Sequence, residues 1–141
     1  MPDSLKESAP RVVLDASALL VYLQRERGHL LVEPVLEASA MSAVNLSEVL
    51  QKSAAVGVST AGLQADLQAV GLRVHAFDSE DAACAADLWA STRKLGLSLG
   101  DRACLALAKR LRVPAYTADR AWAAVRIGAG GFALATAHQS A

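Results

Sequence analysis

The segment that decides the fold is Arg11-Val12-Val13-Leu14-Asp15-Ala16-Ser17, a short apolar run that closes on an acidic residue. Its β-branched residues favour a strand over Val12–Asp15, and the following residues favour a helix from Ser17 to Arg27. A strand without polar alternation is typical of a parallel sheet that is covered on both faces. We therefore expect β–α connections and an α/β fold.

Working outward, the same strand–helix alternation continues through the whole chain of 141 residues. Further strands are predicted at Ala40–Val44, Leu72–Phe77, Val113–Thr117 and Phe132–Thr136. Helices are predicted between them, including one capped by Asn45 and one long helix from Ser79 to Lys94. This order predicts a three-layer α/β/α sandwich with a mainly parallel, roughly five-stranded sheet. Residues 11–136 would form this domain, between a polar tail at 1–10 and a second tail at 137–141.

Four acidic residues fall at separate strand-to-helix corners. Asp15 and Asp119 end predicted strands, whereas Glu48 and Asp101 lie in first helical turns. The carboxyl ends of parallel strands share one edge of a sheet, and that edge is where such folds bind ligands. Carboxylates gathered there would repel one another unless a divalent cation lay between them. The set therefore indicates a metal-dependent site.

Each acid also has a structural explanation. Asn45 to Glu48 and Ser98 to Asp101 both fit the spacing of a capping box, and Asp15 and Asp119 fit the N-cap position. A capping carboxylate still has a second oxygen to offer a metal, so capping and metal binding remain compatible.

Two hydroxyl residues, Ser17 and Thr117, lie two positions from Asp15 and Asp119 and are candidate supporting groups. Ordinary helix-start chemistry explains Ser17 about equally well. Asp87 falls within a predicted helix and is a weaker candidate. All-oxygen donors suit Mg²⁺ or Mn²⁺, which activate water and stabilise charge on a phosphate. The chain has no Walker A loop, GxGxxG motif or GxSxG elbow.

Composition places further limits on function. No apolar run reaches the roughly 18–20 residues that span a bilayer, and the N-terminal residues do not have the pattern of a signal peptide. Cys84 and Cys104 fall among Ala and Leu, as buried thiols do. These features predict a cytoplasmic protein. Net charge is zero, but setting the four site acids aside leaves ten acidic residues against fourteen Lys and Arg, a balance that suits a polyanionic substrate.

Two other functional classes stay open at this stage. An aspartyl phosphatase needs two aspartates flanking one residue, but Ser17 stands where the second is required. A phosphorelay receiver needs an Asp on the third strand and a Lys on the fifth, and the fifth predicted strand has no Lys. The other class is a catalytically silent protein-binding module, which the intact acidic set disfavours.

Four segments resemble the signature segments of PIN domains, in the order and spacing of VapC-type toxins from bacterial toxin–antitoxin pairs. They are Val13-Leu14-Asp15-Ala16-Ser17-Ala18-Leu19-Leu20, Asn45-Leu46-Ser47-Glu48-Val49, Leu97-Ser98-Leu99-Gly100-Asp101-Arg102-Ala103-Cys104-Leu105-Ala106-Leu107-Ala108 and Tyr116-Thr117-Ala118-Asp119-Arg120-Ala121-Trp122. The resemblance implies a five-stranded parallel sheet, Mg²⁺- or Mn²⁺-dependent RNA cleavage, a homodimer and a small antitoxin that occludes the site. It implies that Asp15, Glu48, Asp101 and Asp119 form the catalytic, metal-binding set, with Ser17 and Thr117 beside it.

Overall fold

The computed structural model of the chain describes residues 9–119 and 134–136. Its elements follow one another as β1 (Val12–Leu14), α1 (Ala16–Leu23), α2 (His29–Val32), η2 (Glu33–Ala38), β2 (Ser39–Ser42), α3 (Ala43–Ala55), α4 (Leu63–Ala69), β3 (Arg73–His75), α5 (Ser79–Asp87), α6 (Trp89–Thr92), η3 (Arg93–Leu95), α7 (Leu99–Leu111), β4 (Ala115–Thr117) and β5 (Leu134–Thr136). Helices and strands alternate as the sequence predicts.

The five strands form one parallel sheet in the order β3-β2-β1-β4-β5. At its centre, Val13 of β1 is in register with Ala40 of β2 and Ala115 of β4. The chain runs outward from β1 through β2 to β3, and then crosses to β4 on the other side of β1. The junction of β1 and β4 is therefore the point where strand order reverses, the usual ligand position in an open α/β sheet.

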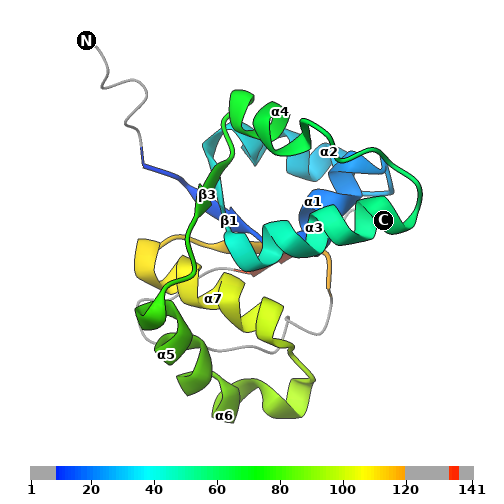
Figure 1. Cartoon of the computed structure of the whole chain (residues 1–141). Coiled ribbons are helices and arrows are strands. Elements are labelled where there is room, and N and C mark those ends of the chain that lie inside the picture. The colour runs from blue at the N-terminus through cyan, green and yellow to red at the C-terminus, as the bar shows by residue number, and fades with distance from the viewer. Residues whose placement is uncertain (1–8, 120–133, 137–141) are drawn as a thin grey trace.

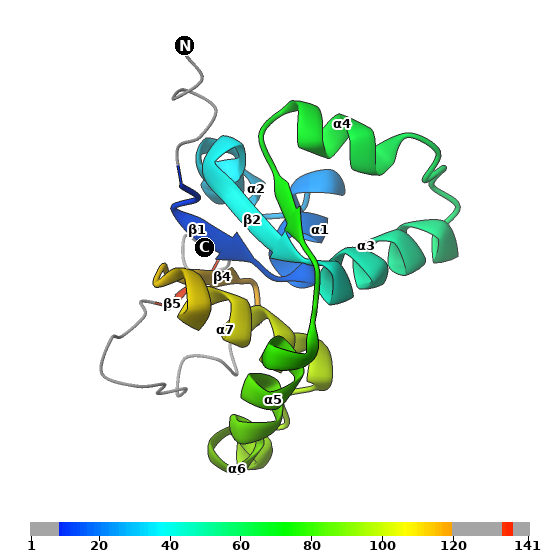
Figure 2. The ribbon, with the colours of Figure 1, turned by 60° about the vertical axis from the view of Figure 1, so that its left-hand side comes forward.

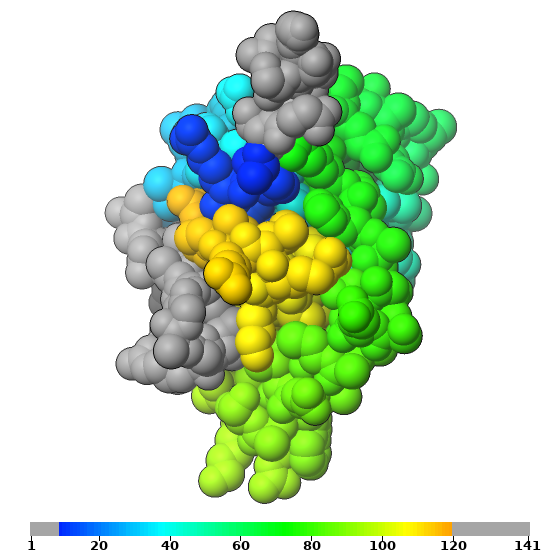
Figure 3. Space-filling view, turned by 90° about the vertical axis from the view of Figure 1, so that its left-hand side faces the viewer, coloured from blue at the N-terminus to red at the C-terminus, as the bar shows by residue number. Residues whose placement is uncertain are grey.

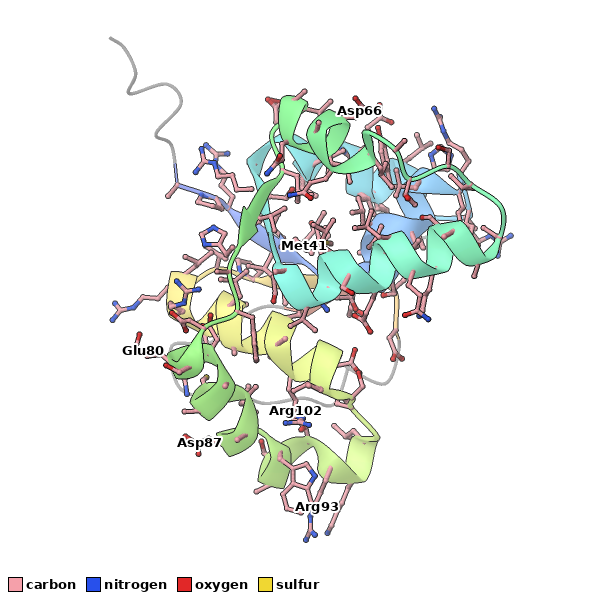
Figure 4. All side chains as sticks on the ribbon, in the orientation of Figure 1. Met41, Asp66, Glu80, Asp87, Arg93 and Arg102 are labelled. Atoms are coloured by element: carbon pink, nitrogen blue, oxygen red, sulfur yellow. The ribbon has the colours of Figure 1, made fainter. Side chains whose placement is uncertain are left out.

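Both faces of the sheet are covered by helices, which confirms the predicted three layers (Figures 1 and 2). Val12 and Leu14 belong to the apolar cluster under α1 and α3, whereas Val13 belongs to the cluster under α5 and α7. Met41 of β2, labelled in Figure 4, is fully buried in the first cluster. Because both faces are buried, β1 consists of consecutive apolar residues.

Helix α7 lies across the second face and connects the sheet to α5. The Arg110 Nε on α7 is 3.1 Å from Asp81 Oδ1 on α5. One turn into α7, Arg102 Nη1 donates to the Ala85 carbonyl oxygen at 2.8 Å. Figure 3 views the molecule from the side where β1 begins, with α7 next to it. These polar contacts fix the direction of α7 and therefore the position of its N-terminus.

Three helix predictions were wrong in detail. The helix expected from Ser17 to Arg27 spans Ala16–Leu23, and Arg25 beyond it has a left-handed φ of 54°. The long helix expected from Ser79 to Lys94 is divided into α5, α6 and η3. The hydroxyls of Ser91 and Thr92 both donate to the Leu88 carbonyl oxygen, at 3.2 and 2.8 Å, and such bonding bends helices. The helix expected to start at Asn45 begins at Ala43 instead, with Ser42 as its N-cap.

Some expectations lie outside the described residues: most of the helix after Asp119, the glycine loop that follows it, and nearly all of both tails. Within the part of the chain that the structure describes, no helix has the length and apolar character needed to cross a membrane.

Candidate active site

The corner between β1 and α1 is built around the Asp15 carboxylate. Asp15 is the N-cap of α1, where its Oδ1 accepts from the Ala18 backbone N–H at 2.8 Å. Ser17 Oγ donates to the same carboxylate at 2.8 Å, and Thr117 Oγ1 donates to its Oδ2 at 2.6 Å. Only 3% of Asp15 is exposed. The N-cap prediction is confirmed, and the carboxylate is held by partners from two strand ends.

The two hydroxyl groups also fix the chain beyond β4. Ser17 Oγ accepts from the Ala118 backbone N–H, and Thr117 Oγ1 accepts from the Asp119 backbone N–H, both at 2.9 Å. Each hydroxyl has one proton, and each donates that proton to Asp15. Ser17 and Thr117 are therefore positioning residues that join the ends of β1 and β4 through one buried acid.

Burial has a direct effect on the ionisation of Asp15. Desolvation raises its pKa from 3.8 to about 6, although the hydrogen bonds from Thr117, Ala18 and Ser17 act in the opposite direction. The negative charge of Asp101 adds a smaller upward contribution. The corner thus holds a carboxylate whose charged form is disfavoured in the absence of a cation.

Glu48 reaches the same region from the first half of α3. The Asn45 side-chain amide donates both to Glu48 Oε1 at 3.0 Å and to the Gly100 carbonyl oxygen at 2.9 Å. A Cβ atom on Gly100 would lie 2.6 Å from Glu48 Oε1, so the carboxylate occupies the space that a side chain would need. Asn45 is therefore not the helix cap that its spacing suggests, but the link that holds α3, Glu48 and α7 together.

Asp101 lies in the first turn of α7 and forms the predicted capping box. Its Oδ2 accepts from the Ser98 backbone N–H at 2.9 Å, and its own backbone N–H donates to Ser98 Oγ at 3.2 Å. The second carboxylate oxygen takes no part in the box. The structural and functional interpretations of Asp101 are therefore compatible, because one oxygen caps the helix and the other is left for the pocket.

All four acids line one pocket of about 220 Å³ at the carboxyl edge of the sheet. Its lining residues are Asp15, Ala16, Ser17, Glu48, Lys52, Ser98, Asp101 and Asp119. A larger hollow of about 620 Å³ lies near the start of β1, among Arg11, Glu37 and Arg73, but no acid of the set lines it. The acidic lining of the smaller pocket, and not its volume, makes it the candidate site.

The negative charges of these acids also affect Cys104, a buried thiol in the core next to the pocket. Burial raises the pKa of the Cys104 thiol well above its usual range, and the charges of Asp15, Asp101 and Glu48 raise it further. Cys104 lies on α7 one turn beyond Asp101 and is fully buried. Three carboxylates on three different elements therefore act on one point, as expected for a converging set.

The donors in this pocket are oxygen atoms, which fit Mg²⁺ or Mn²⁺ better than zinc. Within residues 9–119, no group of three or more His, Cys, Asp or Glu side chains is arranged so that it could hold a metal ion by itself. Mg²⁺ commonly keeps several waters and takes only one or two protein carboxylates, so an open set of this kind is compatible with it. Asp15, Glu48, Asp101 and Asp119 all line this pocket and could each offer an oxygen atom to such an ion.

Three contributors to the pocket are not evident from the sequence. Asn45 links α3 to α7, Gly100 leaves space for Glu48, and Lys52 lines the pocket. Only Lys52 had a local signal, because it follows Glu48 by four residues and so shares its helix face. The weaker candidate Asp87 is exposed on α5 and does not line the pocket (Figure 4).

The PIN domain family model matches residues 12–128, which include all four acids. The chain belongs to the PIN domain family. No curated protein matches the chain. Among solved structures, a toxin–antitoxin complex from Klebsiella pneumoniae has a TM-score of 0.68 at 19% identity, over 93% of this chain and 98% of that one.

Other solved structures have a similar fold. FitAcB from Neisseria gonorrhoeae has a TM-score of 0.66 at 18% identity, over 89% of this chain and 97% of that chain. A VapBC-5 toxin–antitoxin structure from Mycobacterium tuberculosis has a TM-score of 0.59 at 23% identity, over 90% and 99% of the two chains. These likenesses confirm the PIN-type fold that the sequence analysis predicted.

Proposed function

We propose that this PIN domain is a Mg²⁺- or Mn²⁺-dependent endoribonuclease that acts in the cytoplasm as the toxin of a toxin–antitoxin pair. One observation carries the proposal: the pocket of about 220 Å³ is lined by Asp15, Glu48, Asp101 and Asp119. Four carboxylates around a solvent-open pocket suit hydrolysis of a phosphodiester. PIN nucleases generally use divalent metals, which is consistent with this donor set.

In this mechanism each acid has a task that follows from its surroundings. Asp15 is immobilised by Ser17 and Thr117, so it defines the position of the site. Asp101 presents its free oxygen from the start of α7, and Asn45 orients Glu48 from α3. Asp119 lies at the exposed rim, where its backbone is held by Thr117. A bound Mg²⁺ or Mn²⁺ would lower the pKa of water and stabilise negative charge on the scissile phosphate.

The phosphatase and receiver alternatives gain no support from the structure. Asp78, which follows the third strand, caps α5 through a reciprocal bond with Asp81. It does not line the acidic pocket. Hydrolysis of RNA therefore remains the function that the geometry supports best.

Assay of the purified protein on RNA tests the activity. Cleavage is expected with Mg²⁺ or Mn²⁺ and none with EDTA. Asp101→Asn keeps the side-chain shape and should fold, yet lose roughly a hundredfold or more of the activity, since even outer-shell changes at metal sites cost 10- to 100-fold. Asp66→Asn, an exposed acid on α4, is the matched control. Equal cleavage by the Asp101→Asn protein would contradict the proposed site.

An antitoxin partner is proposed on different grounds. Leu30 on α2 is 67% exposed and Val56 at the end of α3 is 65% exposed, although both elements lie near α1. Such surface apolar residues are suited to a protein partner. The solved PIN-like structures from K. pneumoniae and M. tuberculosis are described as toxin–antitoxin proteins. We infer that a small antitoxin covers this region, and that the toxin forms a homodimer.

Co-expression with a small protein encoded beside this gene tests the partner. A stable complex should appear in gel filtration and should inhibit cleavage, and light scattering should give the mass of a toxin dimer. Leu30→Glu and Val56→Glu should weaken the complex without reducing RNA cleavage by the free toxin. Retention of full affinity in both variants would place the partner elsewhere.

A further inference from the structure

A second pocket adjoins the acidic one on the same edge of the sheet. It has a volume of about 360 Å³ and is lined by Ser17, Leu20, Val21, Gln24, Glu26, Lys52, Ala118 and Asp119. Ser17, Lys52 and Asp119 line both pockets. The two hollows are therefore neighbours, with these three residues between them.

We propose that this second pocket is a subsite for the nucleotide next to the scissile phosphate, and that Lys52 holds the phosphate between the two pockets. This inference rests on the proposed ribonuclease function. It assigns a role to the Lys52 ammonium group and to the pocket of about 360 Å³, neither of which the four acids explain.

The charge of Lys52 is the first argument. Lys52 is exposed on α3, one turn after Glu48, and among the residues lining the two pockets that the structure describes it is the only basic one. The described contacts include no ion pair between Lys52 and Glu48 or Asp119. An ammonium group that has no ion-pair partner among the residues that the structure describes is suited to a ligand that carries negative charge.

The lining of the second pocket is the next argument. Leu20 and Val21 supply an apolar floor, and Gln24 supplies an amide that can both donate and accept. Small-molecule pockets generally have volumes of about 300–1,000 Å³, and a value of about 360 Å³ suits a single nucleotide. Glu26 makes the far end unfavourable for phosphate, so the base is expected there and the phosphate at Lys52.

Lys52 and Gln24 are therefore expected to affect RNA binding in different ways. Lys52 would contact the backbone and act on every RNA sequence, whereas Gln24 would contact a base edge and act on sequence preference. This difference separates the subsite from a general loss of structure.

The experiment compares Lys52→Gln with Lys109→Gln, an exposed lysine at the far end of α7. Lys52→Gln should raise KM for RNA roughly five- to tenfold with little change in kcat. It should also reduce the slope of log affinity against log salt by about 0.7–1, which corresponds to one lost phosphate contact. Lys109→Gln should leave both unchanged.

Gln24→Ala is compared with Gln68→Ala, an exposed glutamine on α4. On an RNA of mixed sequence, Gln24→Ala should change the relative use of cleavage positions while the salt slope stays as in the wild type. The Gln68→Ala protein should keep the wild-type pattern of cleavage.

Binding of a short fluorescein-labelled single-stranded RNA in EDTA makes the subsite testable without catalysis. If the wild type binds but does not cleave with Mg²⁺ or Mn²⁺, the ribonuclease proposal fails, and weaker binding by Lys52→Gln still supports the subsite. The subsite is overturned if Lys52→Gln and Lys109→Gln behave alike. It is also overturned if Lys52→Gln lowers only kcat and the melting temperature, or if Gln24→Ala leaves the cleavage pattern unchanged.

Discussion

The two sides of the acidic pocket are built in opposite ways. On the β1 side, Asp15 is buried and both of its oxygens accept hydrogen bonds from side chains or backbone. On the α3–α7 side, Glu48 and Asp101 are partly exposed, and each is held mainly through one oxygen. We call the β1 side the fixed side, because Asp15 is held through both oxygens. We call the α3–α7 side the adjustable side, because Glu48 and Asp101 are partly exposed and each is held mainly through one oxygen.

This difference between the two sides shows that the destabilising group, the buried Asp15 carboxylate, lies on the fixed side. The change in pKa of Asp15 from 3.8 to about 6 corresponds to about 3 kcal/mol of unfavourable free energy when the group is charged at neutral pH. A fixed, desolvated carboxylate has little means to relieve this penalty by moving.

The largest expected effect is a change in the free energy of unfolding with pH that is caused by Asp15 on the fixed side. Because the folded pKa of Asp15 is raised, its contribution is fully present below about pH 3.8 and is lost as pH rises through about 6. In EDTA, Asp15 should therefore lower the free energy of unfolding by about 2.5 kcal/mol between pH 4 and 7. Saturating Mn²⁺ should offset the loss, by about 2.7 kcal/mol at a hundred times its dissociation constant. Denaturant melts at several pH values measure both effects.

Asp15→Asn is the variant that isolates this effect, and Asp66→Asn on α4 is its exposed control. The first should remove the decline between about pH 4 and 7, whereas the second should retain it. An unchanged decline in the Asp15→Asn protein would show that another group is responsible.

The next largest effect is expected for Thr117→Val, which removes a hydrogen bond on the fixed side. Thr117 is fully buried, and valine keeps its shape but leaves Asp15 Oδ2 without its shortest donor and the Asp119 N–H without an acceptor. We expect a loss of about 2 kcal/mol in the free energy of unfolding. The pKa of Asp15 should also rise, because the Thr117 hydrogen bond lowers it. Thr117→Ser keeps the hydroxyl and should lose less. No loss of stability in Thr117→Val would show that the hydroxyl contributes little to the fold.

Gly100→Ala tests the adjustable side without breaking the fold. The new Cβ would meet Glu48 Oε1 at 2.6 Å and Oε2 at 2.7 Å, and a flexible side chain can move away. Alanine also favours the helix by about 0.5–1 kcal/mol, so the melting temperature should stay or rise. Displacing Glu48 should nevertheless lower RNA cleavage by about tenfold, within the range found when groups around a metal are disturbed. Full activity would mean that Glu48 is not needed at its observed position.

Ser98→Ala should have the smallest effect. It removes the hydroxyl that accepts from the Asp101 backbone N–H, so the stability of α7 should fall by about 1 kcal/mol. The Ser98 backbone N–H still holds Asp101, so activity should change little. Ser47→Ala, at an exposed position within α3, is the control and should be neutral in thermal melts. A large loss of activity would show that the adjustable side is more rigid than its exposure indicates.

The sequence predicted the parts of this molecule that depend on local chemistry. The all-apolar β1, the Asp15 cap and the Ser98–Asp101 capping box each rest on residues within three or four positions. Placing acids at strand ends and helix starts was enough to bring them to one edge, because parallel strands share that edge.

What the sequence did not show depends on distant partners. Both Ser42 and Asn45 are good helix caps, and only contact with Gly100, 55 residues away, explains why Asn45 lies inside the helix. No Gly or Pro marks the point after α5 where the predicted helix is divided. At that point the hydroxyls of Ser91 and Thr92 donate to the Leu88 carbonyl oxygen, a contact that the sequence does not show. The raised pKa of Asp15 likewise required its burial to be known.

The hydrogen bond between Thr117 and Asp15 has a consequence for synthesis of the protein, because it joins residues separated by 102 positions. During translation, Asp15 emerges early, but its shortest donor is made only after most of the domain has left the ribosome. Closing such a long loop is also a slow step in folding. The nascent chain should therefore carry an unfinished pocket until β4 pairs with β1, so that any nuclease activity appears only with the almost complete polypeptide.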